Sequence, residues 1–436
     1  MNCGYTRQRG ERSRHPRFLR AALAAAMTAT VLAGCASAST DEPEPGPLTM
    51  LLPAGTVADS MQPIVDEFSE STGIDVNAIV LPVNDMRSRQ VLSLNQKSSE
   101  LDVIMLDDSW VAEVRNHLLP LDMITESDLD GYLPSVVEAF KTDGTLWALP
   151  SYMSTRTIFY RTDILEEAGL EPPRTFDELR ATAKALTTGP QYGFVFPLGN
   201  SETYVNSWAT FAYNAGMEGL LNDSNTEAAF NDEGGLAALE LLDGIFKDGS
   251  MPPDSIQYGM EQVATAMYEG QAAMGMLSTP FVERLSDPAN TQFAGKFRMM
   301  PMPQAEGVTG DSYITAGFGF SLSKYGEHQD EALELLRFIN EKFLHPGPDA
   351  DASVITNPAS EDAFASPALA EVFVDGQDEL IEHMMTEATT RPHVSQWGEI
   401  VTVLGTEMQK VFLGQQSAKD ALTKSEEQVN EALSKD

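Results

Sequence analysis

The chain has 436 residues, of which 28 are Lys or Arg and 65 are Asp or Glu, so its formal net charge is −37 at pH 7. A surface this acidic repels phosphate backbones and anionic lipid headgroups, which excludes nucleic acid as a partner and favours a soluble monomer. With 42% apolar residues, the chain is long enough for two hydrophobic cores, because one domain takes roughly 150 residues.

The first 34 residues have the composition of an export signal. Six arginines between Arg7 and Arg20 precede an apolar stretch, Ala21 to Ala33, and small residues lie just before Cys35. The stretch Leu32-Ala33-Gly34-Cys35 resembles a bacterial lipobox, which implies cleavage before Cys35 and lipid chains on its thiol. An ordinary secretory signal cut before a cysteine is the alternative. The apolar stretch is too short to span a bilayer, so we expect lipid to anchor the protein on the extracytoplasmic face of the cell membrane.

Cleavage leaves residues 35–47 as an acidic, Pro-rich tether, a composition that buries nothing and stays extended. Six arginines and one glutamate leave with the signal, so the mature chain carries about −42. Cys3 lies in the signal and Cys35 is used for lipid. We therefore expect neither an intrachain disulfide nor a thiolate metal site.

Strands and helices alternate in the part of the chain that follows the tether. Met61, Ile64, Val65 and Phe68 have helical spacing, and Gly73 suits the left-handed position that ends a helix. A polar helix is expected at 87–94. Apolar runs predict strands at 48–52, 76–83 and 101–106. This alternation predicts parallel strands in a βαβ arrangement, and therefore an α/β fold.

A second set of elements begins near Trp147. Leu149-Pro150 is expected to end a strand, and Thr175 to Glu178 is a capping box that opens a helix. Further strands are predicted at 157–160, 272–277, 298–302 and 313–323. Helices are predicted at 176–186, 204–215, 234–246, 255–268 and 329–343. The C-terminal hundred residues are expected to be wholly helical.

Six stretches, taken in their order, resemble the extracellular solute-binding proteins of the carbohydrate class (family 1), of the maltose- and trehalose-binding kind. They are FSESTGI at 68–74, LDVIMLDDSWV at 101–111, GTLWALP at 144–150, FYRTDILEEAGLEP at 159–172, MYEGQAAM at 267–274 and PMP at 301–303. Each stretch alone is weak evidence. All six in the family's order form a specific signature, and the resemblance covers nearly the whole mature chain.

The resemblance implies a two-lobe, periplasmic-binding-protein-like fold of type II, with a hinge and a ligand cleft between the lobes. The N-terminal lobe would comprise 48–153 plus 314–360, and the C-terminal lobe 154–313 plus 361–436. Chain crossings are expected at 153–157, 311–316 and 357–366. It further implies that hinge closure captures a carbohydrate, a di- or oligosaccharide, which is delivered to ABC transporter permease subunits.

Asp107, Asp108 and Trp110 follow the predicted strand at 101–106. Open α/β sheets bind ligands at the carboxyl ends of their strands, so these side chains are candidates for the site. Carboxylates can accept hydrogen bonds from sugar hydroxyls, and the Trp ring offers an apolar face to a pyranose. The alternatives are that Asp107 caps the next helix and that Trp110 belongs to the core.

The resemblance adds further ligand-binding candidates on both lobes and at the crossings. They are Thr56 and Asn84 in loops of the first lobe; Tyr152 and Ser154, with Arg156 beside them, at the first crossing; Glu202, Tyr204 and Trp208 at the start of a helix of the second lobe; Phe281, where the family often has Trp; Gly317 and Phe318 in the cleft floor; and Arg391 and Trp397. Structural alternatives stay open: turn chemistry for Thr56 and Asn84, core packing for Trp208 and Gly317, and a surface ion pair for Arg391.

No motif for a catalytic nucleophile, a metal site or a nucleotide-binding loop is found, so we expect no catalytic residues, no metal and no cofactor. Paired carboxylates keep one enzymatic alternative open, in which Asp107 or Asp108 opposite Glu202 acts on a glycosidic bond. A lipoprotein scaffold for cell-wall assembly is another alternative. A polyol or a glycerol phosphodiester also remains open as the ligand.

Overall fold

The computed structural model describes residues 47–54, 56–344, 360–364, 369, 373 and 375–435. The signal, Cys35 and all of the tether except Pro47 lie outside the described residues, as does most of the expected crossing at 357–366. The side chains of Thr56, Asn84 and Tyr152 also lie outside them. Within the described part of the chain, no helix is both long enough and apolar enough to cross a membrane.

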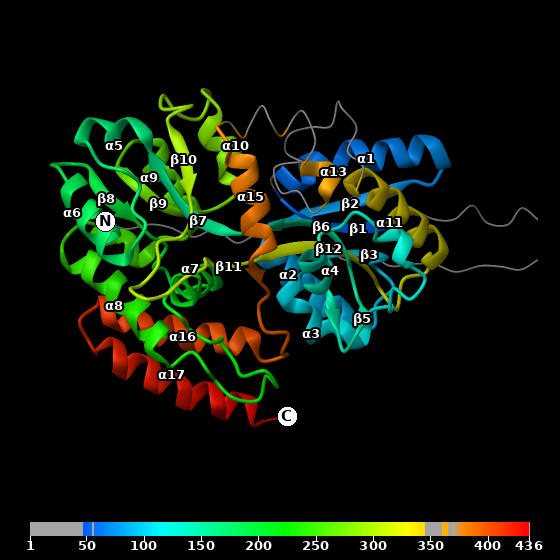
Figure 1. Cartoon of the computed structure of the whole chain (residues 1–436). Helices are drawn as coiled ribbons and strands as arrows, with labels where there is room; N and C mark the ends of the chain where they lie inside the picture. The colour runs from blue at the N-terminus through cyan, green and yellow to red at the C-terminus, as the bar shows by residue number, and fades with distance from the viewer. Residues whose placement is uncertain are drawn as a thin grey trace, which may run out of the picture. The chain divides into compact units, whose positions relative to one another are not determined.

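The first sheet has five strands in the order β2-β1-β3-β12-β6 (Figure 1). The first three strands of the chain are parallel to one another, and helices connect them, as the alternating pattern predicts. The other two strands are antiparallel to their neighbours. The elements are β1 (Leu48–Pro53), α1 (Thr56–Thr72), β2 (Val76–Leu81), α2 (Val83–Asn95), β3 (Val103–Asp107), β6 (Leu149–Ser154), β12 (Ala316–Leu322) and α11 (Gln329–Leu344).

The second sheet has four strands in the order β10-β7-β9-β8. Strands β8 and β9 are parallel, whereas β7 is antiparallel to both β9 and β10. The capping box at Thr175 and Glu178 is present and opens α6 as predicted. The elements are β7 (Arg156–Arg161), α5 (Thr162–Ala168), α6 (Phe176–Leu186), β8 (Tyr192–Val195), α7 (Glu202–Tyr213), α8 (Glu233–Lys247), α9 (Met260–Tyr268), β9 (Ala272–Ser278), α10 (Phe281–Ser286) and β10 (Phe297–Met300).

The two C-terminal helices, α16 (Trp397–Phe412) and α17 (Ala418–Leu433), lie against α7 and α8 (Figure 1). They cover faces of α7 and α8 that would otherwise meet solvent, so α7 is buried along most of its length. The shorter elements are η1 (Asp108–Trp110), α3 (Val111–Val114), η2 (Arg115–His117), η3 (Glu126–Asp128), α4 (Pro134–Glu138), β4 (Lys141–Thr142), β5 (Thr145–Leu146), η4 (Pro253–Gln257), β11 (Tyr313–Ile314), α13 (Glu361–Phe364), α15 (Gln377–Thr386) and β13 (Ala388–Thr389).

The chain leaves the first sheet through single residues at two places. Thr155 separates β6 of the first sheet from β7 of the second, and its backbone exchanges hydrogen bonds with Thr279. Thr315 separates β12 from β11, which pairs with β13 in a small sheet of its own. Both threonines are completely buried. The carboxyl end of β6 and the amino end of β12, which pair with each other, therefore mark the edge at which the chain leaves the first sheet.

Four predicted elements differ from those observed. Leu149 and Pro150 begin a strand instead of ending one, and β6 tolerates Pro150 because it is an edge strand that pairs only with β12. The helix predicted at 255–268 is split at Gly259, whose N–H donates to Gln262 at 2.9 Å. The strand predicted at 313–323 is split at Thr315. The C-terminal region is not wholly helical, because β13 pairs with β11.

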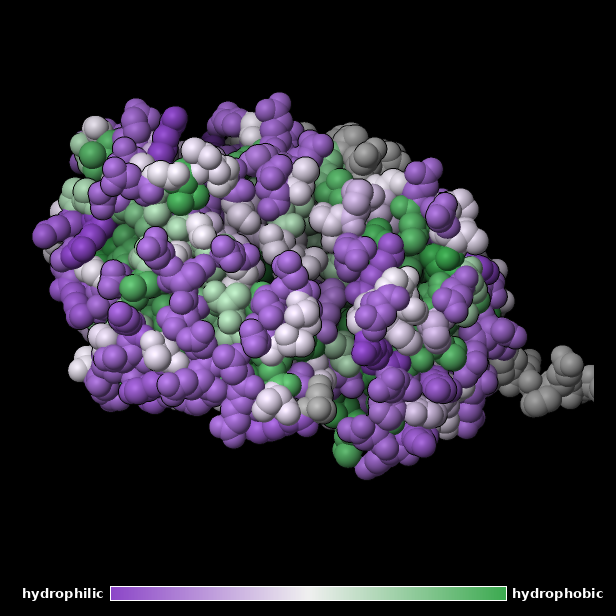
Figure 2. Space-filling model, turned by 60° about the horizontal axis from the view of Figure 1, so that its bottom comes forward, coloured by the Kyte–Doolittle hydropathy of each residue, from purple (hydrophilic) through white to green (hydrophobic). Residues whose placement is uncertain are grey.

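The surface drawn in Figure 2 is predominantly hydrophilic, and apolar residues show in small areas only. Among the described residues, the large apolar side chains that are exposed are Val80 on β2, Leu92 on α2 and Leu413 just after α16. Scattered apolar residues of this kind are ordinary on a soluble protein. The face shown therefore presents no large apolar patch.

Candidate ligand-binding site

Asp107 and Asp108 lie at the carboxyl end of β3, as the apolar run before them predicts. Asp107 is the N-cap of η1: its Oδ1 accepts hydrogen bonds from the N–H of Ser109 at 3.0 Å and from the Ser109 hydroxyl at 2.6 Å. Asp108 is fully buried, and its Oδ1 accepts from the Gly317 N–H on β12 at 2.9 Å. Asp107 therefore caps a helix, as the alternative from the sequence proposed, and the same carboxylate also contacts a second group.

The second contact is Arg391, which follows β13 and is almost completely buried. Its Nη2 donates to Asp107 Oδ1 at 2.6 Å and also to Asp108 Oδ1, while its Nε donates to Asp108 Oδ2 at 3.3 Å. Its Nη1 donates to Oε1 of Glu202, the first residue of α7. One planar guanidinium thus joins the end of β3 in the first sheet to a helix that packs beside the second. The surface ion pair considered for Arg391 is excluded by its burial.

Burial and mutual repulsion set the charge of this cluster. Burial raises the pKa of Asp107 to about 7; Arg391 opposes this rise, and Asp108 and Glu202 add to it. Burial also acts to raise the pKa of Glu202, but Arg391 and the hydrogen bond from Trp397 outweigh it, so that this pKa is lowered. Burial, with repulsion from Arg391, lowers the pKa of Arg156 to about 10. Three carboxylates and two guanidiniums therefore share one site of nearly balanced charge.

A cavity of about 650 Å³ opens beside the cluster. Its volume is in the range of small-molecule sites, roughly 300–1,000 Å³. The aromatic rings of Trp110 and Phe318 meet edge to face in its wall, with centroids 5.9 Å apart, and Arg87 lies over the Trp110 ring. Its lining residues are Arg87, Asp107, Trp110, Ser154, Arg156, Asn200, Ser201, Glu202, Thr203, Asn206, Gly259, Ala316, Gly317, Phe318, Arg391, Trp397, Gly398, Val401 and Thr402.

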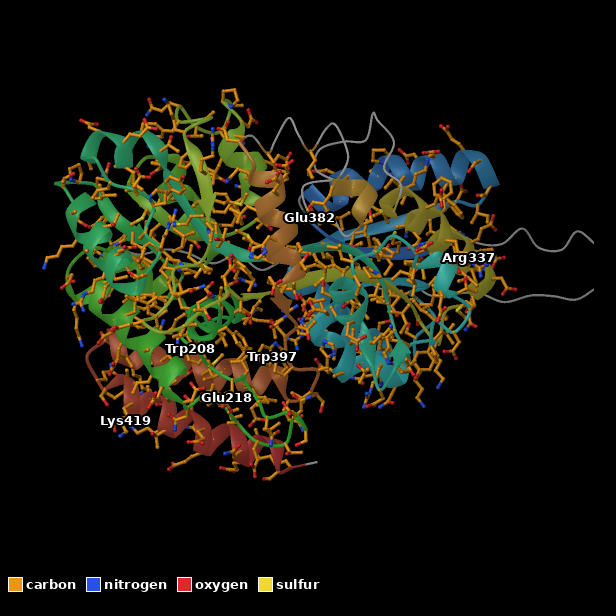
Figure 3. The ribbon with its side chains drawn as sticks, viewed as in Figure 1. Trp208, Glu218, Arg337, Glu382, Trp397 and Lys419 are labelled. Carbon is orange, nitrogen blue, oxygen red and sulfur yellow. The ribbon has the colours of Figure 1, made fainter. Side chains whose placement is uncertain are left out.

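Eight of the candidates predicted from the sequence line this cavity. They are Asp107, Trp110, Ser154, Glu202, Gly317, Phe318, Arg391 and Trp397. Trp397 begins α16, as labelled in Figure 3, and its indole N–H donates to Glu202 Oε1 at 2.8 Å. Asp108 lies behind the wall, where it holds Arg391 and the backbone of β12. The structure thus brings together residues that are far apart in the sequence.

Other candidates lie elsewhere in the structure. Trp208, on α7 in Figure 3, is fully buried against Phe230, and its indole N–H donates to the Gly235 carbonyl at 3.3 Å. Tyr204 is also fully buried, in an aromatic cluster. Phe281, on α10, packs beside Arg284 and is not among the lining residues. The candidate side chains of Thr56, Asn84 and Tyr152, and Cys35, lie outside the described part of the chain.

Asn206, Asn200 and Arg87 line the cavity but were not among the sequence-based candidates. Asn206 follows Glu202 by four residues, a spacing that places both on one face of α7. That periodicity is the signal that identifies Asn206 once Glu202 is assigned to the site. No signal in the neighbouring sequence identifies Asn200 or Arg87 as part of the site, because the tertiary placement of their loop and helix brings them to the cavity. Within the described residues, no cluster of His, Cys, Asp and Glu is arranged to hold a metal ion.

A larger cavity, of about 1,100 Å³, lies between α6 and β10, away from the Arg391 cluster. Its wall includes Leu170, Pro172, Met299 and Met300, and none of the buried polar atoms that lack a partner in the described residues belongs to it. The smaller cavity, by contrast, has two such side chains, Arg156 and Asn206. Convergent polar groups distinguish a binding site from a gap between elements, so the smaller cavity is the candidate site.

The model of the bacterial extracellular solute-binding protein family matches residues 54–342. A probable ABC transporter-binding protein of Deinococcus radiodurans is 25% identical over 286 residues, which are 63% of this chain and 67% of that protein. A galactooligosaccharide-binding protein of Bacillus subtilis is 24% identical over 340 residues, 75% of each. The maltose-bound MalE3 of T. maritima superposes with a TM-score of 0.78 at 21% identity, covering 89% of this chain and 99% of that one. This last similarity shows the two-lobe α/β fold.

Proposed function

The chain belongs to the bacterial extracellular solute-binding proteins, and from this premise we propose that it binds a neutral sugar, a di- or oligosaccharide, in the cavity beside Arg391 and serves an ABC importer. The observation that carries the proposal is that one cavity wall combines hydrogen-bond acceptors, a hydrogen-bond donor and aromatic rings. The carboxylates of Asp107 and Glu202 can accept hydrogen bonds from a ligand, Arg156 can donate them, and the aromatic rings of Trp110 and Phe318 line the same cavity. Hydroxyl groups both donate and accept, and the C–H faces of a sugar ring pack on aromatic rings.

The relatives support a sugar as the solute. The similar protein of B. subtilis is named for galactooligosaccharides, and the similar structure from T. maritima holds maltose. The charge of the cavity favours a neutral ligand. Asp107, Asp108 and Glu202 nearly balance Arg391 and Arg156, so the cavity has no excess positive charge to attract a phosphodiester or another anion. A neutral polyol could form the same hydrogen bonds, and the screen described below distinguishes a polyol ligand from a sugar.

We place the hinge at Thr155 and Thr315, with the lobes as 48–153 plus 314–360 and 154–313 plus 361–436. The reason is that the chain leaves the first sheet at these two threonines, for the second sheet at Thr155 and for the small β11-β13 sheet at Thr315. A ligand that contacts Asp107 at the end of the first sheet and Glu202 on α7 favours the closed arrangement, because only that arrangement allows both contacts. Closure about a few backbone torsions would then enclose the sugar and expel water.

We further propose that Cys35 is the lipidated N-terminus of the mature protein, which holds it as a monomer on the extracytoplasmic face for delivery to the permease. The motif around Cys35 and the family support this assignment. A Cys35→Ser variant expressed in a bacterial host should move from the detergent phase to the aqueous phase of a Triton X-114 partition and lose labelling by palmitate. Retention in the detergent phase by this variant would contradict the anchor.

We propose that the protein returns its sugar unchanged, without catalysis. Arg391 engages both Asp107 and Glu202, and the first of them also accepts two hydrogen bonds from Ser109. Carboxyls held in this way are oriented for binding, whereas a glycosidase needs one of them free to protonate the leaving oxygen. Incubation of the purified protein with galactotriose and maltotriose, followed by chromatography, should return both sugars intact. Released mono- or disaccharide would support the enzymatic alternative.

The binding proposal is tested by a thermal-shift and calorimetric screen of the purified mature chain. The panel contains maltose, galactobiose, arabinobiose, ribitol and mannitol, with glucose 6-phosphate as the anionic comparison. A ligand raises the thermal midpoint in proportion to RT ln(1 + [L]/Kd), so a binder at 100 times its Kd gains about 2.7 kcal/mol. We expect at least one neutral sugar to raise the midpoint. The proposal is refuted if no sugar binds, or if glucose 6-phosphate is the one compound of the panel that binds. If ribitol or mannitol binds and no sugar does, the ligand is a polyol and not a sugar.

A further inference from the structure

Two polar side chains in the cavity wall have no partner for several of their buried atoms. Both polar atoms of the Asn206 side chain, Nδ2 and Oδ1, are buried without a hydrogen bond in the described structure. The same holds for Nε and Nη1 of Arg156. Asn206 is fully buried and Arg156 nearly so. Burying polar atoms without a partner costs free energy, and buried polar groups in folded proteins are almost always paired.

Buried side chains of the same two types, beside the same two elements, do have hydrogen-bond partners. Asn214, at the end of the same helix, is equally buried, and its amide donates to Thr210 O at 2.8 Å and Ser312 O at 2.6 Å and accepts from the Ser312 N–H at 3.2 Å. Arg161, at the other end of β7, pairs with Asp163 through Nε and Nη2, both at 2.8 Å. On α7 the hydroxyls of Tyr204 and Ser207 are also buried without a partner in the described structure, but among the unpaired side chains Arg156 and Asn206 are the two that line this cavity.

The unpaired atoms lie beside acceptors that have spare capacity. Glu202 and Asn206 occupy successive turns of one face of α7, and Arg156 begins β7 within electrostatic reach of Glu202 and Asp107. Glu202 makes its contacts with Arg391 and Trp397 through Oε1, and Asp107 makes its contacts through Oδ1. Their second oxygens, Oε2 and Oδ2, are thereby left to accept from a ligand. This part of the wall therefore offers both hydrogen-bond donors and acceptors to a ligand.

We propose that Arg156 and Asn206 are the specificity-determining residues of the site, and that they bind a vicinal pair of hydroxyls on a neutral ligand while Glu202 accepts the hydroxyl hydrogens. This assignment rests on the proposed function and extends it. A vicinal diol presents two oxygens that accept from a guanidinium and an amide and two hydrogens that a carboxylate accepts. A carboxylate or phosphate accepts equally well but has no hydrogen for Glu202, so the site rejects it.

The assignment has a consequence that is measurable without a ligand. In the free protein, the unpaired amide of Asn206 is a cost, so a leucine of similar size relieves it. We expect Asn206→Leu to raise the thermal midpoint of the free protein by roughly 1–3 °C or leave it unchanged. The matched control, Asn214→Leu, removes an amide whose partners remain buried and should lower the midpoint by several degrees. If Asn206 had a structural role, the thermal midpoints of both variants would fall by similar amounts.

Binding is the second measurement, with maltose, galactobiose and mannitol as probes in calorimetry. Asn206→Leu and Arg156→Met should each raise the Kd of any binding probe roughly 10- to 100-fold, since each loses one or two hydrogen bonds. Arg156→Lys keeps the positive charge but not the planar guanidinium, so it should bind the probe at least about 5-fold more weakly. The control Arg161→Met should stay within about twofold of the unmodified chain, at a temperature where it is folded.

The outcomes separate this assignment from the proposed function. If a probe binds and both Asn206→Leu and Arg156→Met bind it normally, the assignment is wrong and the sugar-binding proposal stands. If digalacturonate binds as tightly as galactobiose, the selectivity for neutral ligands is wrong. If no probe binds the unmodified chain, the proposed function fails. The midpoints of the free proteins still decide whether Asn206 is unpaired, and a fall for Asn206→Leu equal to that for Asn214→Leu overturns the assignment.

Discussion

Removing the guanidinium of Arg391 tests the charge cluster most directly. Arg391→Met keeps much of the side-chain volume and deletes every hydrogen bond that Arg391 makes to the three carboxylates. Asp108 is completely buried, and the side chains of Asp107 and Glu202 are 11% and 29% exposed. Asp108 then stays in the interior without its cation. Breaking a buried ion pair by removing one partner costs about 3–5 kcal/mol, because the remaining charge is uncompensated. We expect a loss of this size in the free energy of unfolding at pH 8.

The same loss should depend on pH, in a direction set by Asp107. Burial raises the pKa of Asp107, and Arg391 is the group that opposes the rise, so this pKa is higher still in Arg391→Met. A carboxyl whose pKa in the folded state exceeds its pKa in the unfolded state contributes stability at low pH that is lost as the pH rises through the folded value. The variant is therefore least stable, relative to the unmodified chain, at pH 8. Its deficit should shrink by at least about 1 kcal/mol at pH 5.

Urea unfolding of the free protein at pH 5 and pH 8 measures both effects. Arg180→Met is the matched control, since Arg180 also makes two hydrogen bonds to one carboxylate, Asp248, but its side chain is 47% exposed. An exposed pair of this kind contributes less than about 1 kcal/mol. A loss below about 1 kcal/mol for Arg391→Met at pH 8, or an equal loss at the two pH values, would refute the argument from burial.

Three further predictions concern single contacts. The thermal midpoint of the unmodified chain should fall relative to that of Asp107→Asn as the pH rises from 5 to 8, because the raised pKa of Asp107 lies in this interval and the amide does not titrate; a constant difference between the two chains contradicts this. Trp397→Phe removes the donor to Glu202 and should weaken binding of the identified sugar about 5-fold in calorimetry, and an unchanged Kd would separate this contact from binding. Gly319→Ala places a Cβ 2.7 Å from the Leu149 carbonyl oxygen and should cost about 1–3 kcal/mol in urea unfolding, whereas a loss below about 0.5 kcal/mol would show that β12 and β6 can separate.

The local pattern predicts most helices and strands of this chain because each depends on neighbours in the sequence. The run Leu101 to Leu106 is apolar without alternation, and it forms a strand whose residues are all buried. Thr175 and Glu178 satisfy each other's backbone in the capping box that the spacing predicts. Two of the errors lie where a distant strand decides the outcome. Pro150 enters a strand because β6 is at the sheet edge, and 388–389 is extended because β11 pairs with it.

Which face of a helix meets the ligand is not a local property. Helix α7 is covered by α8 and α16, so the apolar ring of Trp208 is directed to the core, although a single tryptophan near a predicted site is a reasonable candidate from sequence. The side of α7 that meets the cavity has Glu202 and Asn206 instead. Helical spacing links these two residues to each other, but only the packing of the second sheet and the C-terminal helices decides that their side faces the cavity.

The sequence by itself determines the alternation of strands and helices and the placement of Asp107 and Asp108 at the end of a buried strand. Only the tertiary structure decides the site, because Arg391 is separated from Asp108 by 283 residues and from Glu202 by 189. No local interaction encodes such a contact. It forms when burial removes the carboxylates from water and leaves one guanidinium within reach to balance them, which is a property of two packed sheets and not of any segment.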